Sequence, residues 1–329
     1  MRPLYSSYTR LVWIAASWLL LAACGKKSLS ATTGTAGQHV YIAGDNGTNP
    51  VLWTDSTAQI LSPSVGTATQ VVKAGDDVYV AGVSGEAGYL LPSGPSGIYA
   101  YWKNGQQVNV ADTMFLRATP SVAIAGGRLY FTNGSLWTNG DLTPLSDQGV
   151  TGQVMEVYAS GNDLYAVGSD NSDAMVYWKN GQLNSLSMGN ANTGLPVAFC
   201  IYVSGNDIYV GGRDAEDKPA YWKNGVLNEL KPADPSSSAS TPQAIVVSGN
   251  DVYVVANYYY TYMQPAYWKN GVQQNLPLNG AKSGIAYDIC IADTSVYVVG
   301  QTDSGAVCWK NGVEKVLAAR GTANSIIVQ

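Results

Sequence analysis

The chain has 329 residues, of which 46% are hydrophobic and only 12% are charged, and its formal net charge is −5. This length and apolar content are sufficient for a large buried core. An acidic chain without basic runs argues against nucleic acid or an anionic lipid surface as the main partner. The 22 tyrosines and 36 glycines favour β-strands joined by many turns.

The N-terminal residues are predicted to be an export signal that ends at a lipid anchor. An apolar run over 11–21 follows two arginines and is too short for an ordinary membrane span. Leu21-Ala22-Ala23-Cys24 closes this run and resembles a bacterial lipobox, which implies cleavage before Cys24 and acylation of that residue. Since Gly25 is not the aspartate that marks inner-membrane retention, the resemblance implies an outer-membrane lipoprotein facing either side. The alternative is an ordinary secretory peptide with an incidental cysteine.

Residues 24–37 are predicted to tether the lipid to the folded part of the chain. The stretch 25–37, GKKSLSATTGTAG, is small and polar, so it cannot bury enough surface to fold. Its mean reach as a flexible chain is roughly 20 Å. The predicted organisation is therefore a signal peptide over 1–23, a lipidated tether over 24–37 and one folded domain over 38–329.

A repeat organises the folded part. The tetrapeptide Trp-Lys-Asn-Gly begins at Trp102, Trp178, Trp222, Trp268 and Trp309, and weaker copies begin at Trp53 and Trp137. Each copy follows a strand-like unit centred on a tyrosine, and these seven tyrosines are 35 to 51 residues apart. Repeats of this size with several short strands indicate a propeller or a solenoid.

The best-preserved repeat, 244–275, predicts four antiparallel strands. They are expected over 244–248, 252–255, 265–268 and 272–276. Gly249-Asn250 suits a tight turn, and Asn270-Gly271 suits a type I′ hairpin, which needs positive φ at both central positions. Four such strands make one propeller blade. The inner strands are apolar on both faces, which favours burial between neighbouring blades, and the tryptophan is expected to fill the wide outer part.

The two ends of the folded part complement each other. The first repeat lacks its opening strand and begins at His39-Val40-Tyr41, whereas 325–328 reads as an opening strand with no repeat after it. Pairing them would remove a free edge, which a linear solenoid does not need. We therefore predict an all-β, seven-bladed β-propeller with four antiparallel strands per blade, closed by pairing the C-terminal strand with the first repeat.

Units such as AYWKNG at 266–271 and VSGNDVYV at 247–254 resemble the repeats of a family of bacterial lipoproteins. The resemblance covers nearly all of 38–329 and implies a β-propeller. It implies no particular activity.

Binding is expected where the repeats differ, because positions repeated in every blade serve the scaffold. The short turns lie at one end of the ring, and the variable connections lie at the other. A long insertion over 83–97, the apolar loop after it and a truncated third repeat predict a notch. A tyrosine-rich loop predicts a second surface, since tyrosine offers a flat apolar face with a polar group for sugar or protein. The candidate ligand-binding residues are Tyr89, Phe115, Arg117, Tyr258, Tyr259, Tyr260 and Tyr262. The alternative is that some of these tyrosines fill blade interfaces and the others extend a hairpin.

Acidic residues recur in the loops between the second and third strands of the repeats. They are Asp45, Glu86, Asp170, Asp173, Asp214, Glu216, Asp217 and Asp303. Calcium needs several such oxygens converging, and no Asp-x-Asp-x-Asp-Gly loop is present. We expect no cofactor, and calcium is the alternative left open.

Histidine and cysteine chemistry is sparse. His39 is the single histidine and has no expected partner, so neither a Ser-His-Asp site nor a histidine-based metal site is predicted. Cys200, Cys290 and Cys308 are expected to be buried free thiols. Cys290 and Cys308 should lie two strands apart, roughly 9–10 Å, which is too far for a disulfide. We therefore predict no catalytic residue, although a two-carboxylate glycosidase stays open.

Three functional hypotheses follow. The first is a monomeric, membrane-anchored binding or scaffolding module for a glycan or protein at the bacterial envelope. The second is a carbohydrate-active hydrolase or lyase that uses carboxylates at the variable end. The third is an envelope assembly lipoprotein with a membrane partner.

Overall fold

The computed structural model of the chain describes residues 37–86, 96–111, 119–145, 152–186 and 197–329. These residues form β-strands joined by turns and loops, and no helix occurs among them. That part of the chain accordingly holds no helix long and apolar enough to cross a membrane.

The described residues form seven four-stranded antiparallel sheets, numbered here from first to seventh along the chain. The first sheet is β31 (Ala323–Val328), β1 (Val40–Asp45), β2 (Pro50–Thr54) and β3 (Thr57–Ile60). The second is β4 (Gly66–Ala74), β5 (Asp77–Glu86), β6 (Ser96–Lys103) and β7 (Gln106–Ala111). The third is β8 (Ser121–Ala125), β9 (Arg128–Thr132), β10 (Leu136–Thr138) and β11 (Asp141–Leu142). The fourth is β12 (Gly152–Ser160), β13 (Asp163–Asp170), β14 (Met175–Lys179) and β15 (Gln182–Ser185).

The remaining sheets continue the same order. The fifth is β16 (Val197–Ser204), β17 (Asp207–Arg213), β18 (Pro219–Lys223) and β19 (Val226–Glu229). The sixth is β21 (Ala244–Ser248), β22 (Asp251–Val255), β25 (Ala266–Lys269) and β26 (Val272–Asn275). The seventh is β27 (Gly284–Ala292), β28 (Ser295–Thr302), β29 (Gly305–Lys310) and β30 (Val313–Ala318). A small three-stranded sheet joins β20 (Ser238–Ala239), β23 (Tyr258–Tyr259) and β24 (Met263–Gln264).

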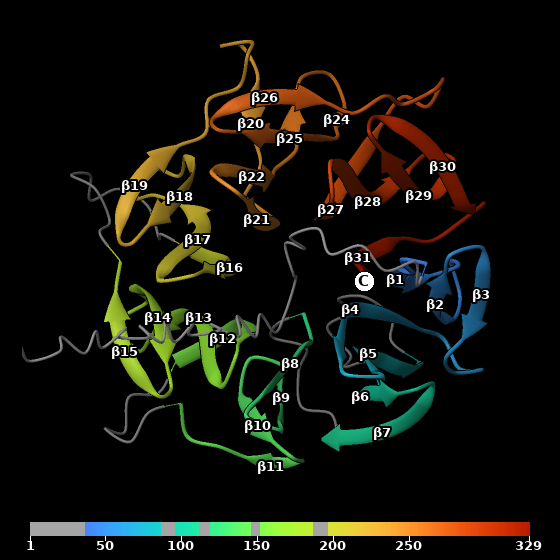
Figure 1. Cartoon of the computed structure of the whole chain (residues 1–329). Helices are drawn as coiled ribbons and strands as arrows, with labels where there is room; N and C mark the ends of the chain where they lie inside the picture. The colour runs from blue at the N-terminus through green and yellow to red at the C-terminus, as the bar shows by residue number, and fades with distance from the viewer. Residues whose placement is uncertain (1–36, 87–95, 112–118, 146–151, 187–196) are drawn as a thin grey trace, which may run out of the picture.

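The sheets follow one another around a common centre (Figure 1). The strand of each sheet nearest that centre contacts the equivalent strand of the next sheet, in the order β4, β8, β12, β16, β21, β27, β31. β31 in turn contacts β4. Each sheet is therefore flanked by two others.

The sixth sheet agrees with the strands predicted for 244–275 to within one or two residues at each end. Asn270 and Gly271 have φ of 52° and 79°, as a type I′ turn requires. Gly249, at the other short turn, has a φ of 60°. β21 and β22 are buried on both faces, because apolar sheets cover them on both sides.

The first sheet joins the two ends of the folded chain, as predicted. Val40 pairs with Val328 and Ile42 pairs with Ile326 in antiparallel register. Ile326 is fully buried, so the C-terminal strand is part of the core.

The core lies between neighbouring sheets. The five tryptophans of the Trp-Lys-Asn-Gly copies are at most 1% exposed. Trp102, for example, belongs to a cluster with Leu52 and Val71 that joins the first and second sheets. Trp137 of the short third sheet is only partly buried, so this weaker copy fills its interface less completely.

All three cysteines of the described residues are buried and form no disulfide, as predicted. Cys200 lies in β16, Cys290 in β27 and Cys308 in β29. Because β28 lies between β27 and β29, the last two cysteines are two strands apart.

Candidate functional site

The predicted tyrosine loop, 258–262, forms a short extension beside the sixth sheet. Tyr258 and Tyr259 are β23, which pairs with β24 and β20. Tyr258 is half-buried against the core. Tyr259, Tyr260 and Tyr262 are 53%, 62% and 50% exposed. The loop therefore presents three aromatic side chains to solvent, and it also extends a hairpin, as the alternative interpretation expected.

The other predicted binding residues, Tyr89, Phe115 and Arg117, lie outside the described residues, as does Cys24. The predicted notch and the lipid anchor therefore stay predictions.

Three of the acidic loop residues, Asp45, Asp170 and Asp214, accept hydrogen bonds from backbone N–H groups of their own turns, whereas Asp303 accepts from a distant segment. Asp214 Oδ1 accepts hydrogen bonds from the backbone N–H groups of Glu216 and Lys218, both at 2.9 Å. Asp303 Oδ2 accepts from the N–H of Lys282 at 2.8 Å. Asp45 Oδ1 accepts in the same way from Gly47 N–H, and Asp170 Oδ1 accepts from the N–H groups of Ser172 and Ala174. Within the described ranges, no group of three or more His, Cys, Asp or Glu side chains converges as a metal site would need.

His39 does have a partner, so the prediction that it lacks one is wrong. Its Nδ1 lies 2.7 Å from Asp55 Oδ2, and both side chains are about half exposed. Asp55 occupies the turn position that asparagine holds in the full copies, and its Oδ1 also accepts from Val40 N–H. The hydrogen bond with His39, and next that with Val40, lowers the pKa of Asp55. The repeat pattern did not predict this pair, because neither His39 nor Asp55 matches the residue found at its position in the other repeats.

At the short-turn end of four sheets, the lysine and asparagine of the repeated motif bind an aspartate of the second strand, and we call this contact the clasp. In the fifth sheet, Asn224 Oδ1 accepts from Ile208 N–H at 2.9 Å, and Asn224 Nδ2 donates to Asp207 Oδ1 at 2.7 Å. Lys223 Nζ lies 2.9 Å from Asp207 Oδ2 and 5.4 Å from the centre of the Tyr209 ring. Hydrogen bonds from Lys223 and then Asn224 lower the pKa of Asp207. The same contacts recur at Asp77, Asp163 and Asp251. These residues therefore serve the scaffold, as predicted.

The end of the sheets opposite the short turns carries a set of β-bulges that the sequence did not predict. Five of the seven strands nearest the centre carry a β-bulge near their start, where one residue has no partner on the adjacent strand. The bulged residues are Thr69, Met155, Phe199, Tyr287 and Asn324. A bulge bends the strand and redirects the side chain at that point.

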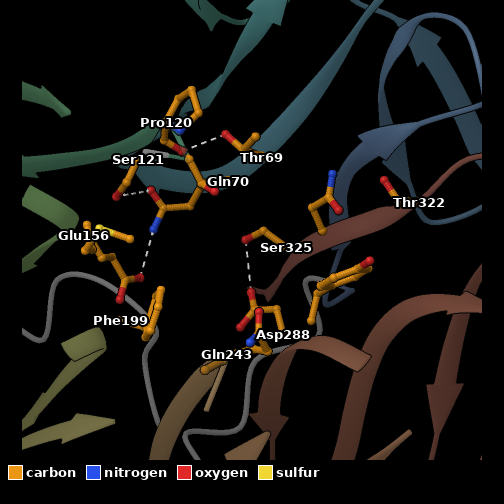
Figure 2. A pocket seen from close by; sticks show the side chains of 15 residues that line it. Thr69, Gln70, Pro120, Ser121, Glu156, Phe199, Gln243, Asp288, Thr322 and Ser325 are labelled. Atoms are coloured by element: carbon orange, nitrogen blue, oxygen red, sulfur yellow. Dashed lines mark hydrogen bonds between the residues drawn. The ribbon is translucent and has the colours of Figure 1, made fainter. Parts of the chain in front are cut away.

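All five bulged residues line one central cavity of about 390 Å³ (Figure 2). This volume lies in the range of small-molecule sites. The other lining residues come from the starts of the same strands and from the connections that lead into them. They are Gln70, Thr119, Pro120, Ser121, Glu156, Gln243, Ala244, Asp288, Thr322 and Ser325. We call this end of the ring the cavity end.

In four of the five bulged sheets, the residue after the bulge connects its sheet to the next, and Ser121 does the same in the third sheet, which has no bulge. Glu156 Oε2 in the fourth sheet accepts from Ile201 N–H in the fifth at 2.9 Å. Asp288 Oδ2 in the seventh accepts from Ile326 N–H in the first at 2.9 Å. Gln70, Ser121 and Ser325 accept in the same way from Val122, Val157 and Val71. These side chain-to-backbone hydrogen bonds thus join five of the seven neighbouring pairs of sheets at the cavity wall.

The cavity combines apolar and polar groups. Figure 2 shows the Gln70–Glu156 and Ser325–Asp288 hydrogen bonds on opposite sides of the hollow. Phe199 adds an aromatic face, and no Lys, Arg or His is among the described residues that line the cavity. Such a wall suits a neutral, polyhydroxylated ligand, which needs amide and carboxylate acceptors together with an apolar surface.

One sequence signal would have revealed the bulges. The second strand of each bulged sheet has a glycine three residues after its central tyrosine, whereas the third and sixth sheets have Asn133 and Ala256 there. A Cβ on Gly168 would lie 1.8 Å from the carbonyl oxygen of Gln153, so the bulged strand approaches too closely for any side chain.

A scan against protein-family models finds no match for the chain, and a search of the curated proteins finds no relative.

Proposed function

We propose that the chain is a membrane-anchored, seven-bladed β-propeller that binds a glycan in its central cavity at the bacterial envelope. Two observations support the propeller: the circuit of contacts among the seven strands nearest the centre, and the pairing of β31 with β1. The lipobox at Cys24 supports the anchor.

The ring of bulged residues carries the binding proposal. These five positions carry five different residues, and so do the five positions that follow them, whereas the Trp-Lys-Asn-Gly positions recur from sheet to sheet. Variable side chains on a regular scaffold are typical of recognition surfaces. Phe199 and Tyr287 offer flat apolar faces to a sugar ring, and Gln70, Glu156 and Asn324 offer hydrogen-bonding groups.

The test is glycan binding by the chain from residue 25 onward, which keeps every described strand. A glycan array would identify ligands, and calorimetry would give Kd for the wild type and three variants. Phe199→Ala and Tyr287→Ala should each weaken binding by about 2 kcal/mol, or roughly 30-fold. Tyr259→Ala is the matched control, since it removes an exposed aromatic ring outside the cavity. Loss of binding in Tyr259→Ala alone would move the site to the tyrosine loop.

A hydrolase is the second candidate, because two carboxylates, Glu156 and Asp288, line the cavity. Against it, both side chains already accept hydrogen bonds from backbone N–H groups, which gives them a structural role. Turnover of a polysaccharide that disappears in Glu156→Gln, with the fold retained, would favour the enzyme.

An envelope assembly role is the third candidate, and the exposed Tyr259, Tyr260 and Tyr262 favour it. It predicts crosslinking of the tyrosine loop to a membrane protein in intact envelopes, without glycan affinity. Replacing the three tyrosines with serine should then abolish the crosslink.

A further inference from the structure

The described chain begins at the short-turn end of the ring. Gln38 Nε2 donates to Asp293 Oδ2 at 3.0 Å, and Asp293 lies in the turn between β27 and β28. The backbone of His39 exchanges hydrogen bonds with that of Gln329, the last residue. His39 also contacts Asp55, which occupies a short turn of the first sheet. The described chain therefore begins at the end of the ring where the repeated clasps lie.

The central cavity lies at the other end. β12 shows the relation, because Met155 and Glu156 near its start line the cavity, whereas Ser160 at its end leads into the turn with Asn162. The same holds for β27, which begins beside the cavity and ends at the Asp293 turn. The start of the described chain and the cavity thus lie at opposite ends of the sheets.

The tether is too short to let either end of the ring face the membrane equally well. To bring the cavity end to the membrane, the chain from Gly37 would have to pass two strand spacings outward, about 10 Å, and then along a nine-residue strand, about 30 Å. Thirteen residues, 25–37, span at most about 45 Å when fully extended, and their mean reach is roughly 20 Å. The reversed orientation therefore requires an almost fully stretched tether, which costs most of its conformational entropy.

We propose that the cavity opens away from the membrane that holds the lipid anchor. This inference rests on the proposed anchor at Cys24 and on the proposed binding role of the cavity. It identifies the ligand as a hydrated glycan chain that approaches from the aqueous side, and it excludes the headgroups of the anchoring bilayer. The orientation is the same whether the protein faces the periplasm or the cell surface.

Energy transfer to a labelled membrane tests the orientation. Asn162→Cys and Ser172→Cys place a fluorophore at either end of β13, one at the short-turn end and one at the cavity end, roughly 26 Å apart. Both positions are exposed, whereas Cys200, Cys290 and Cys308 are buried and resist labelling. The lipidated full-length proteins would be reconstituted in phosphatidylcholine vesicles with acceptor-labelled headgroups, and Cys24→Ala would serve as the unanchored control.

We expect several-fold stronger transfer from position 162 than from position 172. Equal transfer, or stronger transfer from 172, would overturn the orientation and leave the glycan-binding proposal standing. Vesicle association no greater than that of Cys24→Ala would overturn the anchor and the orientation together. Glycan binding by the chain from residue 25 onward is measured without a membrane, so its failure is distinguished from both.

Discussion

Replacing Asp288 with alanine should strongly destabilise the fold. The carboxylate is buried in β27 and accepts from Ile326 N–H at 2.9 Å, from the Ser325 hydroxyl at 3.0 Å and from Ile289 N–H at 2.8 Å. Hydrogen bonds to a charged group contribute about 1.5–3 kcal/mol each, and an unsatisfied buried donor costs about 1–3 kcal/mol. The two bonds to β31 alone suggest a loss of about 3–5 kcal/mol in the free energy of unfolding.

Urea unfolding followed by tryptophan fluorescence would measure this loss. Asp303→Ala is the matched control, because Asp303 also accepts from two backbone N–H groups, those of Lys282 and Ser283. That site is exposed, so water replaces the carboxylate and the expected cost is below about 1 kcal/mol. Asp288→Asn keeps one acceptor oxygen and should fall between the two. A cost for Asp288→Ala no greater than that of Asp303→Ala would refute the role assigned to this bond.

Three further predictions concern the core, the clasps and the thiols. Trp222→Ala should cost roughly 3–5 kcal/mol in urea unfolding, because the side chain is fully buried. Trp137→Ala should cost clearly less, and equal losses would contradict the assigned packing. The pKa of Asp207 is lowered in the folded state by Lys223, so its contribution to stability is present above the unfolded pKa of about 3.9 and is lost as pH falls through the folded value. The urea midpoint of Asp207→Asn should therefore lie below that of the wild type at neutral pH and converge with it near about pH 2, and a pH-independent difference would contradict this. Burial raises the pKa of the Cys308 thiol to about 12, so mass spectrometry should detect iodoacetamide adducts only after unfolding.

The repeated part of the fold was predictable because its signals are local. Asn-Gly pairs mark hairpins within a few residues, and their φ values agree with the expected turns. The pairing of 325–328 with the first repeat was also predictable. The first repeat lacks its opening strand, and 325–328 is an opening strand that no repeat follows.

The candidate site was not predictable from the same signals. A bulge adds one residue to a strand and leaves its apolar pattern nearly unchanged, so Phe199 and Tyr287 read as ordinary strand positions. The contact between Asp288 and Ile326 joins residues of different sheets, and no pattern within one repeat contains it. Glycines such as Gly168 mark the bulged sheets in the sequence. A glycine alone does not predict a bulge, however, because its cause here is the close approach of the neighbouring strand.

The shared first sheet also affects the order of folding. β1 leaves the ribosome early, but its partner β31 is the last described strand to be synthesised. Until β31 arrives, β1 has an unpaired backbone edge, and β4 and β27 each lack a strand that packs against them. The circuit of contacts among the seven sheets can therefore close only once β31 has been synthesised. A truncation that removed β31 would leave β1 without this neighbour and would open the circuit of contacts between β27 and β4.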